Sequence, residues 1–288
     1  MSEAPVEIAD VGNANLPAAK AFLELYPETS LFLLSNIRAF GTRLGASLYS
    51  GNLKALCEGD ELRGVFCLTR GGSLLAQTGG DAKLVPAILR ACREEMIPIR
   101  GVLGEWTVTK ALWDSLCRAG LKPTFESKEV MYRVNLRGPL PEPRATAAAV
   151  RPLNPADHWQ WEQLTGDFVR EVGLPLQGTE DQRKSAFLRS AALGHWWGAF
   201  EGDRLVSLVG ITAMHDTIAQ IGGVFTLPDH RRSGLSTDVM ITLMHDAHSL
   251  HRLDRLFLFT GEDNVAARRM YESLGFESFG HFGLFFGA

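Results

Sequence analysis

The sequence has no apolar run long enough to cross a membrane. No uninterrupted apolar segment approaches the ~20 residues that a bilayer-spanning helix needs. The acidic start, "MSEAPVEIADVG", also lacks the apolar core of a secretory signal. These two absences predict a cytoplasmic protein that makes no membrane contact.

Cysteine is scarce, and its spacing excludes the common metal and redox motifs. The four cysteines, Cys57, Cys67, Cys92 and Cys117, all lie in the first half, and no two of them form a C-x-x-C pair. This pattern argues against a zinc site and against thioredoxin-like chemistry. We expect free, buried thiols in a reducing compartment and no bound metal.

The chain has only a small net charge. A formal net charge of -4 gives no general attraction to nucleic acid or to an anionic membrane. We therefore expect no nucleic-acid partner, and any anion site must be a local cluster of cations. Arg231 and Arg232, in "TLPDHRRSGLSTDVM", form such a cluster.

The composition that is present indicates two globular domains. The chain is 45% hydrophobic and 22% charged, as in ordinary globular proteins, and its 288 residues exceed one average domain. The segment "RGPLPEPRAT" carries three prolines and a glycine, which interrupt helices and central strands. We predict an N-terminal domain at 1–136, a linker at 137–146 and a second domain at 147–288.

Hydrophobic periodicity predicts a similar order of elements in both halves, which suggests a structural duplication. The expected fold class is α/β with a mixed sheet: two similar domains in tandem, each a twisted, mostly antiparallel sheet flanked by helices. In the first half we expect helices at 16–25, 30–42, 82–95 and 110–120, and strands at 47–56, 62–69, 73–79, 99–104, 122–127 and 130–136. In the second half we expect helices at 155–170, 180–193, 235–250 and 264–274, and strands at 149–153, 195–200, 204–214, 218–227, 255–261 and, more than one, within 276–287.

The helix after Gly234 is predicted to begin with an anion site. Apolar residues recur at every fourth position from Leu235, so one face of the helix is buried and its first turn is fixed near the end of the preceding strand. The first N–H groups of a helix have no internal partner and attract anions. Gly234 would let a ligand approach this backbone. Alone, such a motif is more often an ordinary turn with solvated arginines.

A second motif favours an anion site over an ordinary turn. In "NVAARRMYESLGFE", Ala267, Met270, Tyr271 and Leu274 fall at helical spacing, and Gly275 takes the usual C-terminal position. Asn264 lies seven residues before Tyr271, which places both on one side of the helix, about 10 Å apart along its axis.

These two motifs, in this order, resemble the GNAT superfamily of N-acetyltransferases, whose acetyl-coenzyme A loop reads Q/R-x-x-G-x-G/A and whose next helix begins with Asn and carries Tyr before Gly-Phe. The resemblance covers the chain from about Arg151 onward. Ser236 stands where the family usually has Gly or Ala, and its small side chain should still fit.

The resemblance implies that the second domain binds acetyl-coenzyme A as a cosubstrate. Arg231 would take the first motif position, and the backbone from Arg232 to Ser236 would hold the pyrophosphate. Tyr271 would lie near the thioester sulfur and act as the general acid; its alternative is a core tyrosine. The full set of implied cofactor-binding residues is Val224, Phe225, Thr226, Arg231, Arg232, Ser233, Gly234, Leu235, Ser236 and Asn264.

The sequence does not assign the general base. Many family members carry a glutamate on the strand before the loop, but "IAQIGGVFTL" has only Gln220, which cannot accept a proton at neutral pH. His215 and Asp216 in the preceding turn, Glu171 in an expected loop after a helix, and a water relay are the alternatives.

The first half lacks both motifs. "QTGGDAKLV" has no arginine pair and carries Asp81, whose carboxylate can cap the helix and occupy its free amides. We therefore interpret this half as a degenerate acetyltransferase-like domain that packs on the second and contributes to the acceptor wall, with one coenzyme A per chain.

The leading functional hypothesis is an acetyl-coenzyme A dependent N-acetyltransferase that acts on a primary amine of a small molecule or protein. Two alternatives stay open: acyl or aminoacyl transfer to a larger acceptor, and a coenzyme A sensor or scaffold without catalysis, which the missing glutamate favours. Fold alone does not choose a substrate, and the sequence leaves both the acceptor and a homodimer open.

Overall fold

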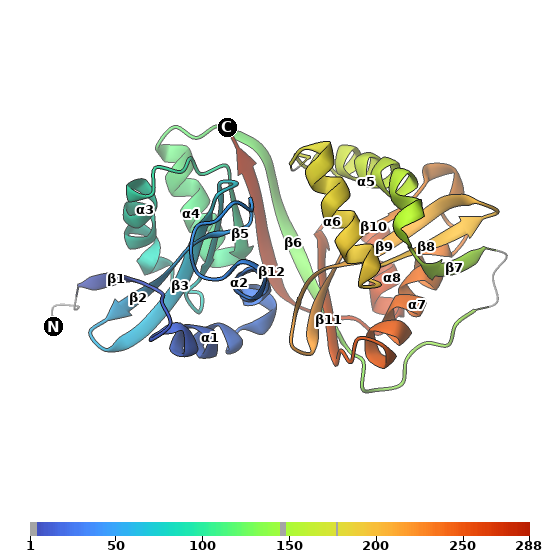
Figure 1. Cartoon of the computed structure of the whole chain (residues 1–288), viewed down its shortest axis with the longest axis horizontal. Helices are drawn as coiled ribbons and strands as arrows, with labels where there is room; N and C mark the ends of the chain where they lie inside the picture. Colours follow the sequence, from blue (N-terminus) through green and yellow to red (C-terminus); the bar gives the residue numbers. More distant parts are fainter. Residues whose placement is uncertain (1–4, 145–147, 177) are drawn as a thin grey trace. The chain divides into compact units, whose positions relative to one another are not determined.

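The computed structural model describes residues 5–144, 148–176 and 178–288, and these form two compact units (Figure 1). The first unit consists of Met1–Met131 together with Gly280–Ala288, and the second of Tyr132–Phe279. Each unit has its own hydrophobic clusters on its own part of the sheet.

The first unit contains a mixed sheet in the strand order β1-β2-β3-β4-β5-β12-β6. The pairs β1/β2, β2/β3, β3/β4 and β5/β12 are antiparallel, and β4/β5 is parallel. The elements are β1 (Val6–Asp10), α1 (Leu16–Glu24), α2 (Pro27–Phe40), β2 (Gly51–Glu58), β3 (Glu61–Thr69), β4 (Ser73–Gln77), α3 (Val85–Glu94), β5 (Gly101–Glu105), α4 (Trp106–Arg118) and parts of β6 (Pro123–Asn135) and β12 (Glu277–Gly287).

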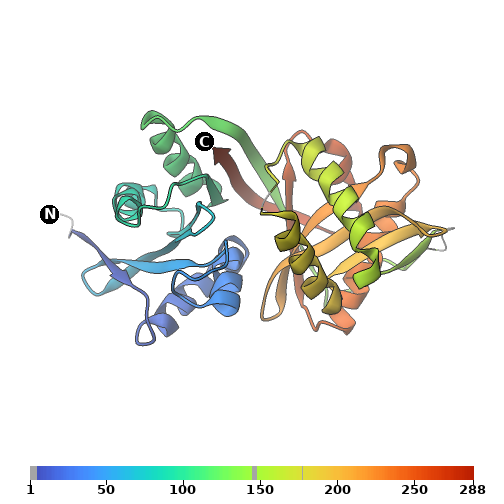
Figure 2. The ribbon, with the colours of Figure 1, turned by 45° about the horizontal axis from the view of Figure 1, so that its top comes forward.

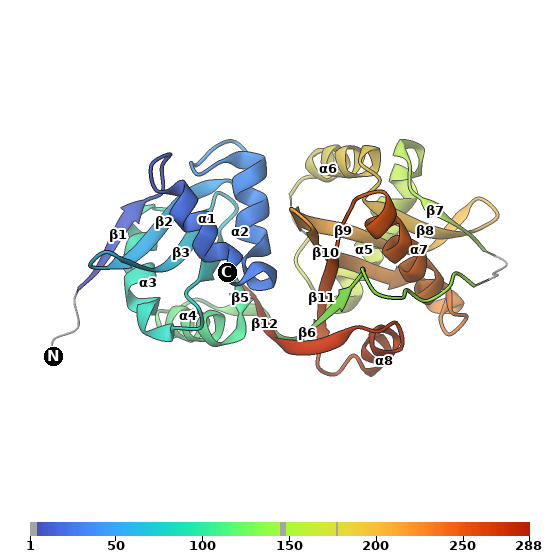
Figure 3. The ribbon, with the colours of Figure 1, turned by 90° about the horizontal axis from the view of Figure 1, so that it is seen from below.

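Helices cover both faces of this sheet. Alternate residues of β3 point to opposite faces, as the pleat requires: Val65 and Cys67 pack with α1 and α2, whereas Phe66 and Leu68 pack with α3 and α4. Figure 3 shows the two helix pairs on opposite sides of the strands.

The second unit has the strand order β6-β11-β10-β9-β8-β7. Its pairs β7/β8, β8/β9 and β9/β10 are antiparallel and β10/β11 is parallel. Its elements are β7 (Ala149–Pro152), α5 (His158–Val172), α6 (Glu180–Ala192), β8 (Trp196–Glu201), β9 (Arg204–His215), β10 (Ile218–Thr226), α7 (Leu235–Ser249), β11 (Arg255–Gly261) and α8 (Val265–Ser273).

Two adjacent tryptophans on β8 show the layering of this unit. Trp196 belongs to the cluster that α5 and α6 form against the sheet, with Trp161 and Phe187. Trp197 points the other way, and its Nε1–H donates to Asp246 Oδ2 of α7 at 2.7 Å. Helices α5 and α6 therefore cover one face, visible in Figure 2, and α7 covers the other.

The repeated order that the sequence predicts is present. Each half runs β-α-α-β-β-β-α-β-α-β, from β1 to β6 and from β7 to β12. The predicted mixed sheets with flanking helices are confirmed. Among the described helices, none is both long and apolar enough to cross a bilayer.

The units divide the chain differently from the boundaries that the sequence suggests. The first unit ends at Met131 instead of 136, and it also takes Gly280–Ala288, which we had assigned to the second domain at 147–288. The reason is strand pairing: Phe282–Phe286 of β12 lie antiparallel to Glu105–Gly101 of β5. Of the predicted linker at 137–146, residues 145 and 146 lie outside the described part.

Several predicted elements differ in extent. Strand β1 was not predicted, and β6 and β12 are each one continuous strand where two were expected. Helix α4 starts at Trp106 instead of 110 because the Glu105 carboxylate accepts hydrogen bonds from the amides of Thr107 and Val108 at 2.9 and 3.2 Å. Such an N-cap satisfies N–H groups that a helix leaves unpaired.

Candidate active site

Strands β10 and β11 separate at the centre of the second unit. They pair in parallel from Ile218 with Arg255 to Gln220 with Phe257, and the pairing ends there although β10 continues to Thr226. Beyond Gln220, β10 therefore runs on without β11 beside it. Ligands of α/β proteins bind in crevices of this kind at strand ends.

A β-bulge lies on β10 where it runs free of β11. Gly222 is opposite Gly210 and Phe225 is opposite Leu208 on β9, so two residues, Gly223 and Val224, share one partner position. Gly223 has φ +64°, and a Cβ there would lie 3.0 Å from the Trp196 ring, so only glycine fits without strain. Bulges often occur next to active sites, and the sequence analysis did not predict this one.

The turn from β10 into α7 leaves backbone amides open, as predicted. Helix α7 begins at Leu235, with Gly234 as its N-cap at φ +87°. Within the described part of the chain, the amides of residues 232–237 donate no hydrogen bond; Asp238 N–H is the first that does, to Gly234 O at 3.1 Å. Arg232 also has a positive φ, +62°. We call the backbone of residues 232–236 the cradle, and such concave runs of amides bind anions.

The two arginines of the motif have different roles. The Arg231 side chain binds other residues of the second unit. Its Nε donates to Thr226 O at 3.0 Å, its Nη2 pairs with Glu171 Oε2 at 2.6 Å, and its guanidinium lies over the Phe225 ring. Arg232 is exposed and forms no hydrogen bond or ion pair with any described residue. Of this pair, Arg232 is the cation left available to an anionic ligand.

A third arginine, which the sequence analysis missed, also reaches the cradle. Arg144, in the predicted linker, donates from Nη2 to Gly234 O at 3.0 Å and from Nε to Asp238 Oδ1 at 2.7 Å. These partners lie 90 and 94 residues away in the sequence, so no local pattern predicts the contact.

The second motif forms α8 as predicted. Asn264 is its N-cap, outside the helix proper, and its Oδ1 accepts from Ala267 N–H at 3.2 Å. Tyr271 is buried, with a relative exposure of 4%, and its ring lies 6.0 Å from that of Tyr132 and 5.9 Å from that of Phe276, centroid to centroid. The Asn264 side chain therefore holds the start of α8.

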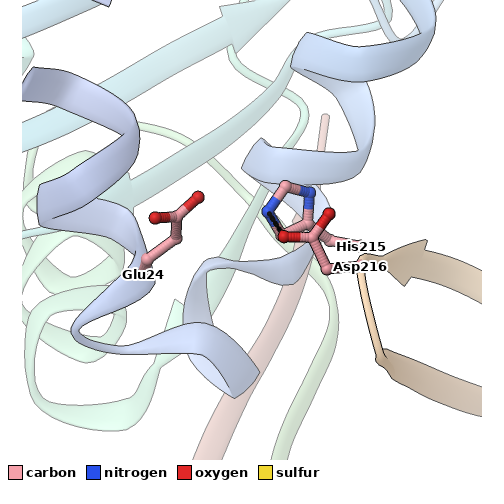
Figure 4. A group of neighbouring side chains, drawn as sticks. All are labelled: Glu24, His215 and Asp216. Carbon is pink, nitrogen blue, oxygen red and sulfur yellow. Dashed lines mark ion pairs between the residues drawn. The ribbon is translucent and has the colours of Figure 1, made fainter. Parts of the chain in front are cut away.

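The candidate bases lie in three different settings. Glu171 is in the last turn of α5, not in a loop, and its carboxylate is paired with Arg231. The Gln220 side chain is buried, accepts from Thr212 and donates to Ile221 O at 2.6 Å. His215 Nε2 lies 3.5 Å from Asp216 Oδ2 (Figure 4).

His215 and Asp216 lie near the first residue of β10, whereas the cradle follows its last residue. His215 ends β9 and faces Ile218, the first residue of β10, whereas the cradle follows Thr226. At roughly 3.3 Å per residue, the strand places these ends well over 20 Å apart. Glu24, also drawn in Figure 4, belongs to the first unit.

The corresponding turn of the first unit is filled by its own side chains. Gly79 N–H donates to Gln77 Oε1 at 2.8 Å, and the predicted Asp81 cap is present, accepting from Lys83 N–H at 3.0 Å. Asp81 also pairs with Arg63 at 3.4 Å, an arginine from β3 that the sequence analysis did not connect to this turn. These bonds use groups that an anion would need.

The four cysteines are free thiols, as expected, but Cys57 and Cys117 are only partly buried, which corrects the expectation that all four are buried. Cys67 and Cys92 are buried, and burial, together with the nearby Glu95, raises the pKa of each to about 12. Both thiols are therefore protonated at neutral pH and unsuited to nucleophilic chemistry.

Comparison with known proteins relates part of the second unit to a known family. Residues 155–276 match the family model "Acetyltransferase (GNAT) family". A search of curated protein sequences gives no significant match.

Solved structures match over nearly the whole chain at low sequence identity, which shows a shared fold. A GNAT-family acetyltransferase from Colwellia psychrerythraea is 14% identical, with 98% of this chain and 100% of that chain covered and a TM-score of 0.55. A GCN5-related N-acetyltransferase from Sphaerobacter thermophilus is 15% identical, with 98% and 96% covered and a TM-score of 0.62. A tandem GNAT protein from the clavulanic acid biosynthesis pathway is 12% identical, with 99% and 98% covered and a TM-score of 0.56. Residues 155–276 are therefore similar to the GNAT acetyltransferase family, and the two units have the tandem GNAT-like fold.

Proposed function

We propose that the second unit is an acetyl-coenzyme A dependent N-acetyltransferase that acetylates a primary amine of a small molecule or protein. The observation that carries this proposal is the cradle: open amides at residues 232–236, with Gly234 at φ +87°, directly after the strand that leaves β11. Its amides and the exposed Arg232 suit a pyrophosphate.

The remaining cofactor-binding residues extend from this point. Val224, Phe225 and Thr226 lie on the part of β10 that no longer pairs with β11, where backbone groups would hold the pantetheine arm, and Asn264 would border it at the start of α8. Arg231 would act indirectly, because its bonds to Thr226 and Glu171 fix the turn that carries the amides.

Acetyl transfer requires a bond to form between the amine nitrogen and the thioester carbon while the carbon–sulfur bond breaks. The leaving thiolate takes a proton, which we assign to the Tyr271 hydroxyl; the amine loses a proton to water, because none of the described carboxylates lies on β10. Bringing the two reactants together supplies much of the rate in such reactions.

The test is calorimetry with coenzyme A, followed by thiol release from acetyl-coenzyme A with a panel of small amines and lysine peptides. We expect stoichiometric binding and amine-dependent release. Absence of binding at millimolar coenzyme A would contradict the proposal.

A coenzyme A sensor without turnover is the second candidate. The engaged side chain of Gln220, at the place where the family carries a glutamate, favours it. Binding of coenzyme A with no thiol release above the rate without amine, across the whole panel, would select the sensor.

The first unit, in this proposal, is a degenerate copy. The support is that Gln77 and Asp81 occupy the amides of the turn that corresponds to the cradle.

A further inference from the structure

Arg144 brings a guanidinium from the segment between the two repeats to the glycine of the cradle. Its Nη2 donates to Gly234 O at 3.0 Å, and a Cβ placed on Gly234 would lie only 2.5 Å from the same nitrogen. The guanidinium therefore lies against the backbone at which the family motif has its glycine.

The partner of Arg144 is a buried carboxylate at the start of α7. Asp238 lies in the first turn of the helix, its side chain is 6% exposed, and its Oδ1 accepts from Arg144 Nε at 2.7 Å. One guanidinium reaches both this oxygen and Gly234 O, so the carboxylate lies within a guanidinium's width of the cradle.

An uncompensated carboxylate at this position would oppose phosphate binding. Like charges repel strongly when they are close and partly desolvated. At physiological ionic strength, salt screens this repulsion only beyond about 8 Å. Arg144 supplies the compensating charge. Its side chain is 52% exposed, and an open pocket of about 170 Å³ adjoins the ion pair, so the pair lies where solvent and solutes reach it.

We propose that Arg144 is a positioning residue for coenzyme A: it cancels the charge of Asp238 and so keeps the cradle receptive to phosphate. This inference rests on the proposed function, because it assumes that coenzyme A binds there. It also assigns a role in the site to Arg144, which lies outside the family motifs.

The test measures the dissociation constant for coenzyme A by calorimetry in four proteins: wild type, Arg144→Gln, Asp238→Asn and the double variant. Arg144→Gln leaves Asp238 uncompensated, and we expect binding about tenfold weaker at low salt, with a smaller loss at high salt. Asp238→Asn leaves the guanidinium charge unopposed, and we expect binding several-fold tighter. In the double variant neither charge remains, and affinity returns to within about threefold of wild type.

Arg137→Gln is the matched control. Arg137 lies in the same segment and also pairs with an aspartate, Asp254, through two hydrogen bonds of 2.8 and 2.6 Å, away from the cradle. Its loss should leave coenzyme A affinity unchanged. In an acetyl-transfer assay, the effect of Arg144→Gln should appear in KM for acetyl-coenzyme A and not in kcat, a split that a general loss of structure would not produce.

Three results distinguish failure of the proposed function from failure of this inference. If wild type does not bind coenzyme A, the proposed function falls and this inference with it. If wild type binds but Arg144→Gln binds equally well, or the double variant stays as weak as Arg144→Gln, charge cancellation is wrong while the proposed function stands. If Arg144→Gln does not fold, Asp238→Asn decides: tighter binding supports the inference, and unchanged or weaker binding overturns it.

Discussion

Tyr132 and Tyr271 face each other in the second unit with ring centroids 6.0 Å apart, and the Tyr132 hydroxyl belongs to a polar network. It donates to Glu272 Oε1 at 2.8 Å and accepts from Arg268 Nε at 3.1 Å. Both rings are buried. Tyr132 therefore takes part in a structural hydrogen-bond network, whereas Tyr271 is the tyrosine that we propose as the general acid.

Replacing Tyr271 with phenylalanine should lower kcat about 10²-fold, the low end for general acid catalysis, while coenzyme A affinity stays the same. Tyr132→Phe is the control: it breaks two hydrogen bonds and should lower the melting temperature with kcat within about threefold of wild type. The measurements are steady-state kinetics on an amine from the panel and thermal unfolding. Wild-type turnover in Tyr271→Phe would make this residue a core tyrosine.

Gly234→Val should abolish coenzyme A binding, because the side chain would fill the approach to the cradle and clash with Arg144, 2.5 Å from the new Cβ. The φ of +87° adds strain, so some stability is lost as well, of the order of 1–3 kcal/mol.

Gly202→Val separates these two effects. Gly202 has φ +59° in the turn between β8 and β9, and a Cβ there meets nothing within 4 Å. It should lose similar stability and keep its coenzyme A affinity by calorimetry. Equal affinity in the two variants would remove the cradle from the binding site.

We expect one coenzyme A per chain. In the first unit, Gln77 and Asp81 accept from the amides of Gly79 and Lys83, so a phosphate there would have to displace bonds already formed. A calorimetric stoichiometry near one, lost in Gly234→Val, would agree; two sites of comparable affinity would show that the first unit also binds the cosubstrate.

Stability of the second unit should fall in mild acid because of His195. Burial, together with the charge of His251, lowers the pKa of His195 to about 4. The unfolded chain, with an ordinary histidine pKa near 6.5, binds the proton first as pH falls, so this contribution is fully present above about pH 6.5 and is lost towards pH 4.

The full shift corresponds to about 3 kcal/mol, and because His195 keeps some solvent contact we expect about half of it. His195→Gln should flatten denaturant-derived stability between pH 6.5 and 4, and His251→Gln should flatten it partly. An unchanged slope in His195→Gln would assign the acid sensitivity to other groups.

The sequence predicts those parts of the site that depend on local pattern. The start of α7 after Gly234, the helix of the second motif and the Asp81 cap follow from helical periodicity and capping preferences over a few residues. The pairs of Arg144 with Asp238 and of Arg231 with Glu171 do not, because they join side chains 94 and 60 residues apart. Periodicity carries no information on which distant partner a charged side chain meets.

The same limit applies to the sheet. The composition of β12 predicts a strand, but its pairing with β5, which assigns the last residues to the first unit, depends on contacts between segments some 180 residues apart. A boundary drawn at a proline-rich segment assumes that domains are continuous in the chain, and here they are not.

The position of β12 also constrains how the protein is made. In the strand order, β12 lies between β5 and β6, both of which leave the ribosome long before it. Until residues 282–286 are synthesised, the edge of β5 has no antiparallel partner, and an open strand edge can pair with other chains. Domains generally fold during synthesis in the order in which they emerge, but the half of this protein that is translated first is completed only after translation of the second.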